Sequence, residues 1–123
     1  MKRILVIDDA ATVRMYHRNV LESADYVVEE AVNGIEALEK ALSEPMDLYL
    51  VDVNMPKLDG YGFLRRLRNE DMPQAPAIMV STEAAPDDQR LAFQSGANLY
   101  LIKPVKPTQL LAHVRILLGE AFQ

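Results

Sequence analysis

A short apolar run that ends on a carboxylate constrains this chain more than any other stretch. Residues 48–51 read Leu-Tyr-Leu-Val, Asp52 follows, and Pro56 stops regular structure two residues past Asn54. The run is too short for a helix and is followed by breakers, so it predicts a buried strand of a parallel sheet. Asp52 would then lie at the carboxyl end of that strand, where open α/β sheets place their ligands. In isolation, an aspartate after a strand more often only caps the next loop.

The rest of the chain alternates between strand-like and helix-like segments. Apolar runs at 4–7, 77–80 and 99–102 predict three more strands, and the more polar residues 26–32 predict a strand at the sheet edge. Apolar spacing and breaker residues predict five helices: over 12–24, from 34 to the residue before Pro45, from just after Gly60 to about 69, from near Pro86 to Gly96, and from 108 onward. This alternation predicts an α/β fold with a parallel sheet.

Length and charge exclude several classes of protein. At 123 residues the chain is expected to form one domain over residues 1–123, without a linker, repeat or output domain. The net charge of −5 argues against a nucleic-acid-binding surface, and the absence of cysteine excludes zinc–thiolate sites. We find no signal-peptide pattern and no apolar run of the ~20 residues that span a bilayer. We therefore expect a cytoplasmic protein that does not contact a membrane, and we separately expect a monomer.

Polar side chains follow four of the five predicted strands where each strand ends. Asp8 and Asp9 follow the first, Asp52 the third, Ser81 the fourth and Lys103 the fifth. Because parallel strands point the same way, these side chains are expected at one edge of the sheet. Clustered carboxylates repel one another unless a cation lies among them, and oxygen ligands suit Mg²⁺ or Mn²⁺. With that cation, Lys103 could neutralise a phosphoryl group, Ser81 could donate a hydrogen bond to it, and Asp52 could attack phosphorus.

The order and spacing of these residues resemble the receiver domain of two-component response regulators. The likeness covers the whole chain, and its combination of motifs is far more specific than any one of them: Asp8-Asp9, Asp52-x-Asn54-x-Pro56 with Gly60, Ser81, and Lys103-Pro104. The resemblance implies a flavodoxin-like, doubly wound sheet of five parallel strands in the order 2-1-3-4-5, with five helices. That order is the one described for flavodoxin and the chemotaxis regulator.

The resemblance also implies a role for each residue of the site. Asp52 would accept the phosphoryl group, and Asp8, Asp9, Asp52 and the backbone carbonyl of Asn54 would hold Mg²⁺, directly or through water. Lys103 would contact the phosphoryl group, and its peptide bond to the following proline would be cis. Asp52, Lys103 and the switch serine would together carry the phosphoryl chemistry.

Two residues would convert phosphorylation into a change of shape. Ser81 would follow the phosphoryl group inward, and Tyr100 would change rotamer with it. The chain departs from the family pattern at Ser81, where threonine is commoner, and at Thr82, where alanine or glycine is usual. Thr82 is therefore expected to narrow access to the acceptor.

Within the family, the chain is most similar to single-domain chemotaxis regulators. Asn54, Glu83, Tyr100 and the Thr-Val-Arg sequence at 12–14 match that subgroup. Asn54 and Glu83 would flank the water that hydrolyses the aspartyl-phosphate, so they would tune the lifetime of the signal.

These observations predict a stand-alone response regulator that a histidine kinase or phosphotransfer protein phosphorylates. It would catalyse only its own phosphorylation and dephosphorylation. Its fourth helix, fifth strand and fifth helix would dock to a target such as the flagellar motor switch. A phosphorelay intermediate or phosphate sink is the alternative. A haloacid-dehalogenase-like phosphatase ranks lower because it would carry Asp-x-Asp after the first strand, where this chain has Asp-Asp-Ala-Ala. A flavodoxin-like flavin carrier would need a Ser/Thr/Gly-rich phosphate loop at the same place.

Three further placements concern side chains on helices. His17 is expected to be a partly packed surface residue rather than a phospho-accepting histidine, and His113 a surface residue. The second helix is expected to turn Leu38, Ala41 and Leu42 inward.

Overall fold

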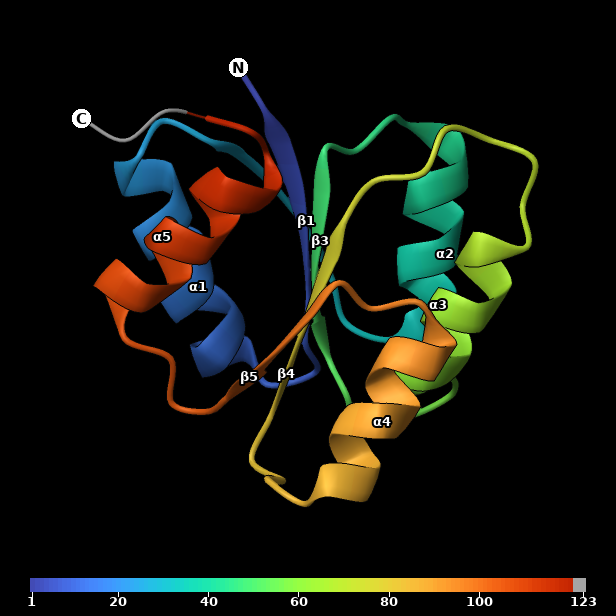
Figure 1. Cartoon of the computed structure of the whole chain (residues 1–123). Coiled ribbons are helices and arrows are strands. Elements are labelled where there is room, and N and C mark those ends of the chain that lie inside the picture. The colour runs from blue at the N-terminus through green and yellow to red at the C-terminus, as the bar shows by residue number, and fades with distance from the viewer. Residues whose placement is uncertain (121–123) are drawn as a thin grey trace.

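The computed structural model describes residues 1–120 as a sheet between two layers of helices (Figure 1). The strands are β1 (Arg3–Ile7), β2 (Val27–Ala31), β3 (Leu48–Asp52), β4 (Ala77–Ser81) and β5 (Leu99–Ile102). The helices are α1 (Ala11–Ser23), α2 (Gly34–Ser43), α3 (Gly60–Arg68), α4 (Pro86–Ser95) and α5 (Pro107–Leu117). In the part of the chain that is described, no helix combines the length and the apolar character needed to cross a bilayer.

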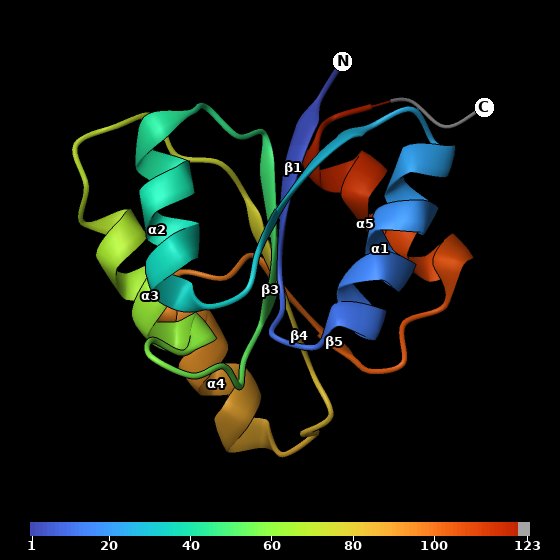
Figure 2. The same cartoon turned by 180° about the vertical axis from the view of Figure 1, so that it is seen from behind.

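All strand pairs are parallel, and the strand order is β2-β1-β3-β4-β5. Helices α1 and α5 cover one face of the sheet, and α2, α3 and α4 cover the other (Figures 1 and 2). The α/β class and the 2-1-3-4-5 order are thereby confirmed. Both faces of the central strands are covered, which is why β3 and β4 are buried at every residue and read as continuous apolar runs.

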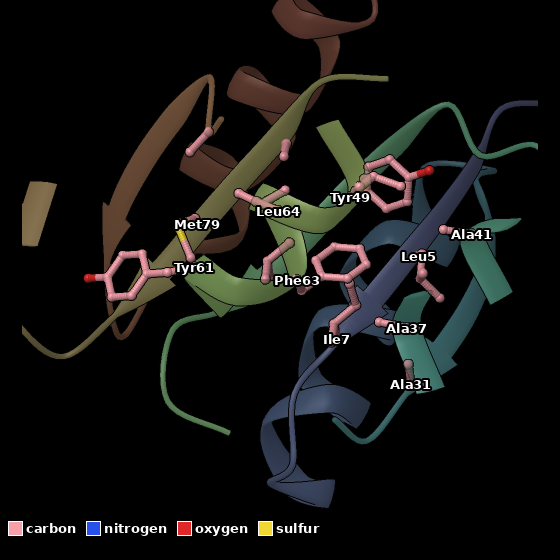
Figure 3. Close-up of a cluster of buried hydrophobic side chains, with 14 of the residues drawn as sticks. Leu5, Ile7, Ala31, Ala37, Ala41, Tyr49, Tyr61, Phe63, Leu64 and Met79 are labelled. Carbon is pink, nitrogen blue, oxygen red and sulfur yellow. The ribbon is translucent and has the colours of Figure 1, made fainter. Parts of the chain in front are cut away.

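Successive residues of β3 supply the two cores. Tyr49 and Val51 belong to the core under α2, α3 and α4, whereas Leu48 and Leu50 belong to the core under α1 and α5. In the first core Tyr49 meets Phe63 of α3 edge to face, with ring centroids 5.8 Å apart (Figure 3). These two cores hold β3 in place and thereby fix the position of Asp52 at its end.

Local signals explain where several helices begin and end. The Asn33 side chain accepts a hydrogen bond from the amide of Glu36 at the start of α2, and Asp59 does the same for Gly62 at the start of α3. Pro86 occupies the first turn of α4, and Gly96 ends that helix in the left-handed conformation, with φ of 116°. The Lys103–Pro104 peptide bond is cis, as expected.

The prediction for Leu42 was wrong, since this residue is 51% exposed. Helix α2 instead packs through the small residues Ala37 and Ala41, which are four positions apart and buried, with Leu38 partly buried beside them. Leu42 follows Ala41 by 100° of helix rotation, so it lies on the flank and lines a groove with Met72 and Pro73.

The prediction for His17 was also wrong, because this side chain is only 2% exposed. His17 lies four residues from both Val13 and Leu21, so it shares the inward-facing line of α1. His113 on α5 is half-buried.

Candidate functional site

The strand ends converge as the sequence predicts. Asp52 lies beside Val80 in the register of β3 and β4, and Ser81 lies beside Ile102 in the register of β4 and β5. Ile7, which precedes Asp8 and Asp9, lies beside Val51. One edge of the sheet therefore carries the two aspartates after β1, Asp52, Ser81 and the lysine that follows β5.

Lys103 joins two of the carboxylates. Its Nζ lies 2.9 Å from Asp52 Oδ1 and 3.0 Å from Asp8 Oδ2. The side chains of Asp8, Asp52 and Lys103 are 2%, 8% and 17% exposed, so these ion pairs are shielded from water. The other oxygen of Asp8 accepts a hydrogen bond of 2.9 Å from the amide of Ala10, which fixes the carboxylate in the turn after β1.

Asp8, Asp9 and Asp52 also meet the requirements of a small divalent cation. Each offers a carboxylate oxygen, and the three oxygens lie within 4.8 Å of one another. Asp8 and Asp52 are buried, while Asp9 is exposed. With Lys103 as the counter-charge, three carboxylates leave two negative charges uncompensated, which matches one Mg²⁺ or Mn²⁺ with its preferred oxygen ligands.

The protonation equilibria follow from this arrangement. Burial raises the pKa of Asp52 above its usual value, and the charge of Asp8 acts in the same direction, while the hydrogen bond from Lys103 opposes the rise. Burial alone would lower the pKa of Lys103, but its hydrogen bonds to Asp52 and Asp8 outweigh that effect and raise it. Lys103 therefore carries its positive charge at neutral pH, next to a carboxylate that is more basic than usual.

Gly60 keeps the loop after Asp52 close to the strand. Its amide donates a hydrogen bond of 2.9 Å to the carbonyl of Val53. A Cβ atom at Gly60 would lie 2.4 Å from the backbone oxygen of Asp52 and 2.7 Å from the Met79 side chain. A larger residue would therefore displace the acceptor backbone itself, and this explains physically why the predicted motif contains glycine here.

The two predicted switch residues hold the same peptide segment. Ser81 is buried, and its Oγ accepts a hydrogen bond of 3.0 Å from the amide of Glu83. The Tyr100 hydroxyl donates a hydrogen bond of 2.7 Å to the carbonyl of Glu83. Glu83 is thus bound on its amide side by one switch residue and on its carbonyl side by the other.

The remaining predicted residues lie in the loops beside the site. Asn54 is exposed two residues past Asp52, and Thr82 and Glu83 are exposed directly after Ser81. The structure brings these loops to the same edge of the sheet, at the ends of the neighbouring strands β3 and β4.

Sequence reasoning missed a cavity of about 390 Å³ next to Lys103. Its walls come from α1 and from the loops after β4 and β5, with His17 and Tyr16 among the lining residues. The Tyr16 hydroxyl donates a hydrogen bond of 2.9 Å to the carbonyl of Val105, so it ties α1 to the loop that follows Lys103. The four-residue spacing of Val13, His17 and Leu21 was the signal that could have placed the histidine inside.

Comparison with known families and proteins gives a consistent result. The family model for the response regulator receiver domain matches residues 4–115. A curated relative, the transcriptional regulatory protein ResD of Bacillus subtilis (strain 168), is 36% identical over 121 residues. The match covers 98% of this chain and 50% of that protein, so the chain spans about half the length of this relative.

Solved structures match over almost their full length. The chemotaxis protein CheY4 of Vibrio cholerae is 33% identical with a TM-score of 0.90, over 95% of this chain and 98% of that one. The receiver domain of the sensor histidine kinase PA1611 of Pseudomonas aeruginosa PAO1, with a magnesium ion coordinated in its active site cleft, is 29% identical with a TM-score of 0.90. That match covers 97% of this chain and 98% of that one.

Proposed function

The chain belongs to the response regulator receiver domain family, and from this premise we propose that Asp52 is its phospho-acceptor. Membership in this family implies a histidine kinase or a phosphotransfer protein as the phosphoryl donor. The observation that carries the proposal is the pairing of Lys103 with both Asp52 and Asp8 at the edge of the sheet. A purely structural aspartate would not need a shared ammonium and two further carboxylates within 4.8 Å.

The transfer forms one bond and breaks one. An oxygen of Asp52 attacks phosphorus, the P–N bond to the donor histidine breaks, and the electron pair leaves with the imidazole nitrogen. Lys103 is held 2.9 Å from Asp52 Oδ1 and supplies a fixed positive charge where the phosphoryl oxygens arrive.

Asp8, Asp9, Asp52 and the backbone carbonyl of Asn54 are the groups that would hold a divalent cation. When bound, Mg²⁺ or Mn²⁺ would supply the additional positive charge that a phosphoryl group needs beside three carboxylates. The solved receiver domain with a coordinated magnesium ion supports this assignment.

The contacts of Glu83 support the proposed switch. A phosphoryl group on Asp52 offers a strong acceptor to the Ser81 hydroxyl, and movement of Ser81 toward it disturbs the hydrogen bond to the Glu83 amide. Tyr100, which binds the carbonyl of the same residue, then loses its present partner. The loss of these hydrogen bonds alters the surface of α4, β5 and α5, which we propose as the docking surface. Phosphorylation would shift the population between two conformations that already exist.

For the downstream role we propose a chemotaxis-type, stand-alone cytoplasmic regulator that binds a target such as the flagellar motor switch. Support comes from Asn54, Glu83 and Tyr100 and from the similarity to CheY4 over 98% of that chain. The protein would act as a monomeric switch that modifies only itself, not as an enzyme with a small-molecule product. Binding of the purified motor switch protein by the phosphorylated form alone would support this role.

A second candidate is the receiver of a transcriptional regulator. The similarity to ResD favours it, because that match covers 98% of this chain. A relay or phosphate sink remains the third reading, and a phosphoryl group that passes to a phosphotransfer protein faster than it hydrolyses would favour it.

Labelling of Asp52 tests the proposed function directly. With acetyl phosphate and Mg²⁺, the wild type should gain one base-labile phosphoryl group, and Asp52→Asn should gain none. Asp71→Asn removes an exposed carboxylate outside the site and should be labelled like the wild type. Equal labelling of Asp52→Asn and the wild type would contradict the proposal.

A further inference from the structure

Arg14 of α1 contacts the turn after β1 that carries Asp8 and Asp9. Its Nη1 donates a hydrogen bond of 2.8 Å to the backbone carbonyl of Asp8. Its Nε donates one of 2.8 Å to Oε1 of Glu30, on the neighbouring strand β2. The Arg14 side chain is only 16% exposed, and its partner Glu30 is 30% exposed, so both contacts are partly buried.

The bond to the Asp8 carbonyl matters because this carbonyl belongs to the peptide that links Asp8 to Asp9. The Asp8 amide is already held by the carbonyl of Ala31, at 3.1 Å, and one Asp8 carboxylate oxygen is held by the amide of Ala10. Arg14 holds the remaining backbone group. The orientation of the Asp8–Asp9 peptide determines where the exposed Asp9 carboxylate points relative to Asp52.

The ion pair with Glu30 restrains the position of the Arg14 guanidinium. Arg18, one turn further along α1, also pairs with Glu30 and in addition with Glu22 at 3.3 Å. The Glu30 carboxylate therefore receives two guanidinium groups, and the planar guanidinium of Arg14 can reach Glu30 and Asp8 at the same time. A lysine would have to reach both acceptors with one nitrogen, whereas Arg14 uses two separate nitrogens, Nη1 for Asp8 and Nε for Glu30.

We infer that Arg14 is a positioning residue for the divalent-cation site: it holds the Asp8 carbonyl so that the carboxylates of Asp8 and Asp9 meet Asp52. The inference rests on the proposed function, because it assumes that these carboxylates bind Mg²⁺. Supporting residues behind metal ligands commonly contribute about tenfold or more to metal affinity.

Arg18 provides a matched control within the same helix. It shares the Glu30 partner but has no bond to the Asp8 carbonyl, and at 38% its side chain is more exposed. If the ion pair with Glu30 merely stabilised the fold, loss of either arginine would affect the cation site alike. If the hydrogen bond to the Asp8 carbonyl positions the ligands, only loss of Arg14 would weaken the cation site.

The experiment measures Mg²⁺ binding to the full chain without any phosphodonor. Titration calorimetry, or the Mg²⁺-dependent amide shifts of residues near Asp52, gives Kd for the wild type, Arg14→Gln, Arg14→Lys and Arg18→Gln. We expect Arg14→Gln and Arg14→Lys to weaken Mg²⁺ binding about tenfold, and Arg18→Gln to change Kd by less than about twofold. In the acetyl phosphate reaction, saturating Mg²⁺ should restore the rate of Arg14→Lys, since Arg14 touches no reacting atom.

The outcomes separate the two proposals. A wild type that binds Mg²⁺ while both Arg14 variants bind it equally well would overturn the inference and leave the proposed function intact. A wild type that neither binds Mg²⁺ nor is labelled at Asp52 would overturn the proposed function first. Thermal unfolding in a chelator checks that each variant is folded, and Arg14→Lys decides the matter if Arg14→Gln unfolds.

Discussion

His17 shows at the scale of one residue how burial changes a titration. Burial lowers the pKa of its imidazole below the usual value of 6.5, and the charge of Lys103 acts in the same direction, while Asp8 opposes it. In the unfolded chain the imidazole is in water and titrates near 6.5. Between the two pKa values, the unfolded chain therefore binds more protons than the folded one. Protons then favour unfolding, and this part of the stability is complete only above pH 6.5.

The first prediction concerns His17→Gln, which removes this titration. As the pH falls from 7.5 to 5.5, the wild type should lose free energy of unfolding relative to His17→Gln, by at most about 1.4 kcal/mol per pH unit. Urea unfolding at the two pH values measures the difference. The same substitution at the half-buried His113 serves as a control for the loss of a histidine. If wild type and His17→Gln differ in free energy of unfolding by the same amount at pH 7.5 and pH 5.5, then burial does not shift the pKa of His17.

At the scale of elements, the sequence predicted the strands and helices well because their signals are local. Apolar runs marked β1, β3, β4 and β5, and the ends of these strands agree within a residue. Side-chain placement on the helices was harder. The burial of His17 follows the four-residue spacing that it shares with Val13 and Leu21, but the exposure of Leu42 depends on how closely α2 packs against the sheet. Small residues such as Ala37 and Ala41 set that distance, and apolar spacing alone does not reveal it.

The segment between β4 and α4 is the element on which the proposed switch depends. The Glu83 amide donates to Ser81 at the end of β4, and the Glu83 carbonyl accepts from Tyr100 in β5; neither hydrogen bond could be read from the sequence. Residues 82–87 are all exposed, so these bonds restrain a segment with little packing of its own.

The second prediction is that Tyr100→Phe loosens this segment without unfolding the domain. Loss of one hydrogen bond, about 1 kcal/mol, should speed amide exchange at Glu83 roughly fivefold, with β1 and β3 unaffected. Hydrogen exchange measured by NMR tests this. Tyr61→Phe is the matched control, because the Tyr61 hydroxyl donates to the carbonyl of Asp88, inside α4, at 3.4 Å. Equal exchange at Glu83 in wild type and Tyr100→Phe would show that the tyrosine does not restrain the segment.

At the scale of the whole molecule, topology assembles a site from residues that are far apart in the sequence. The convergence of Asp8, Asp9, Asp52, Ser81 and Lys103 was predictable, because the carboxyl ends of parallel strands meet at one edge. The pairing of Lys103 with Asp8 as well as Asp52 could not be predicted from the sequence. The hydrogen bond from Arg14 to the Asp8 carbonyl could not be predicted either. Both depend on side-chain distances in the folded structure that no sequence pattern gives.

The third prediction follows from the charge of this assembled site. Uncompensated carboxylates repel one another in the folded state, so a cation that binds only there should stabilise the whole domain. At ten times its Kd, Mg²⁺ should raise the free energy of unfolding by about 1.4 kcal/mol. Asp9→Ala removes one exposed carboxylate from the cluster, so this variant should match or exceed the wild type in stability in chelator and respond little to Mg²⁺.

Thermal unfolding with and without Mg²⁺ measures both effects. The control is Asp71→Ala, which removes the same charge from an exposed position outside the site and should keep the full response to Mg²⁺. Equal stabilisation of Asp9→Ala and the wild type would place the cation elsewhere. A response confined to chains with Asp8, Asp9 and Asp52 intact would tie the stability of the domain to the strand ends where the phosphoryl group is proposed to bind. Asp8 and Asp9 follow β1 and Asp52 ends β3, so the three ligands can meet only in the folded sheet.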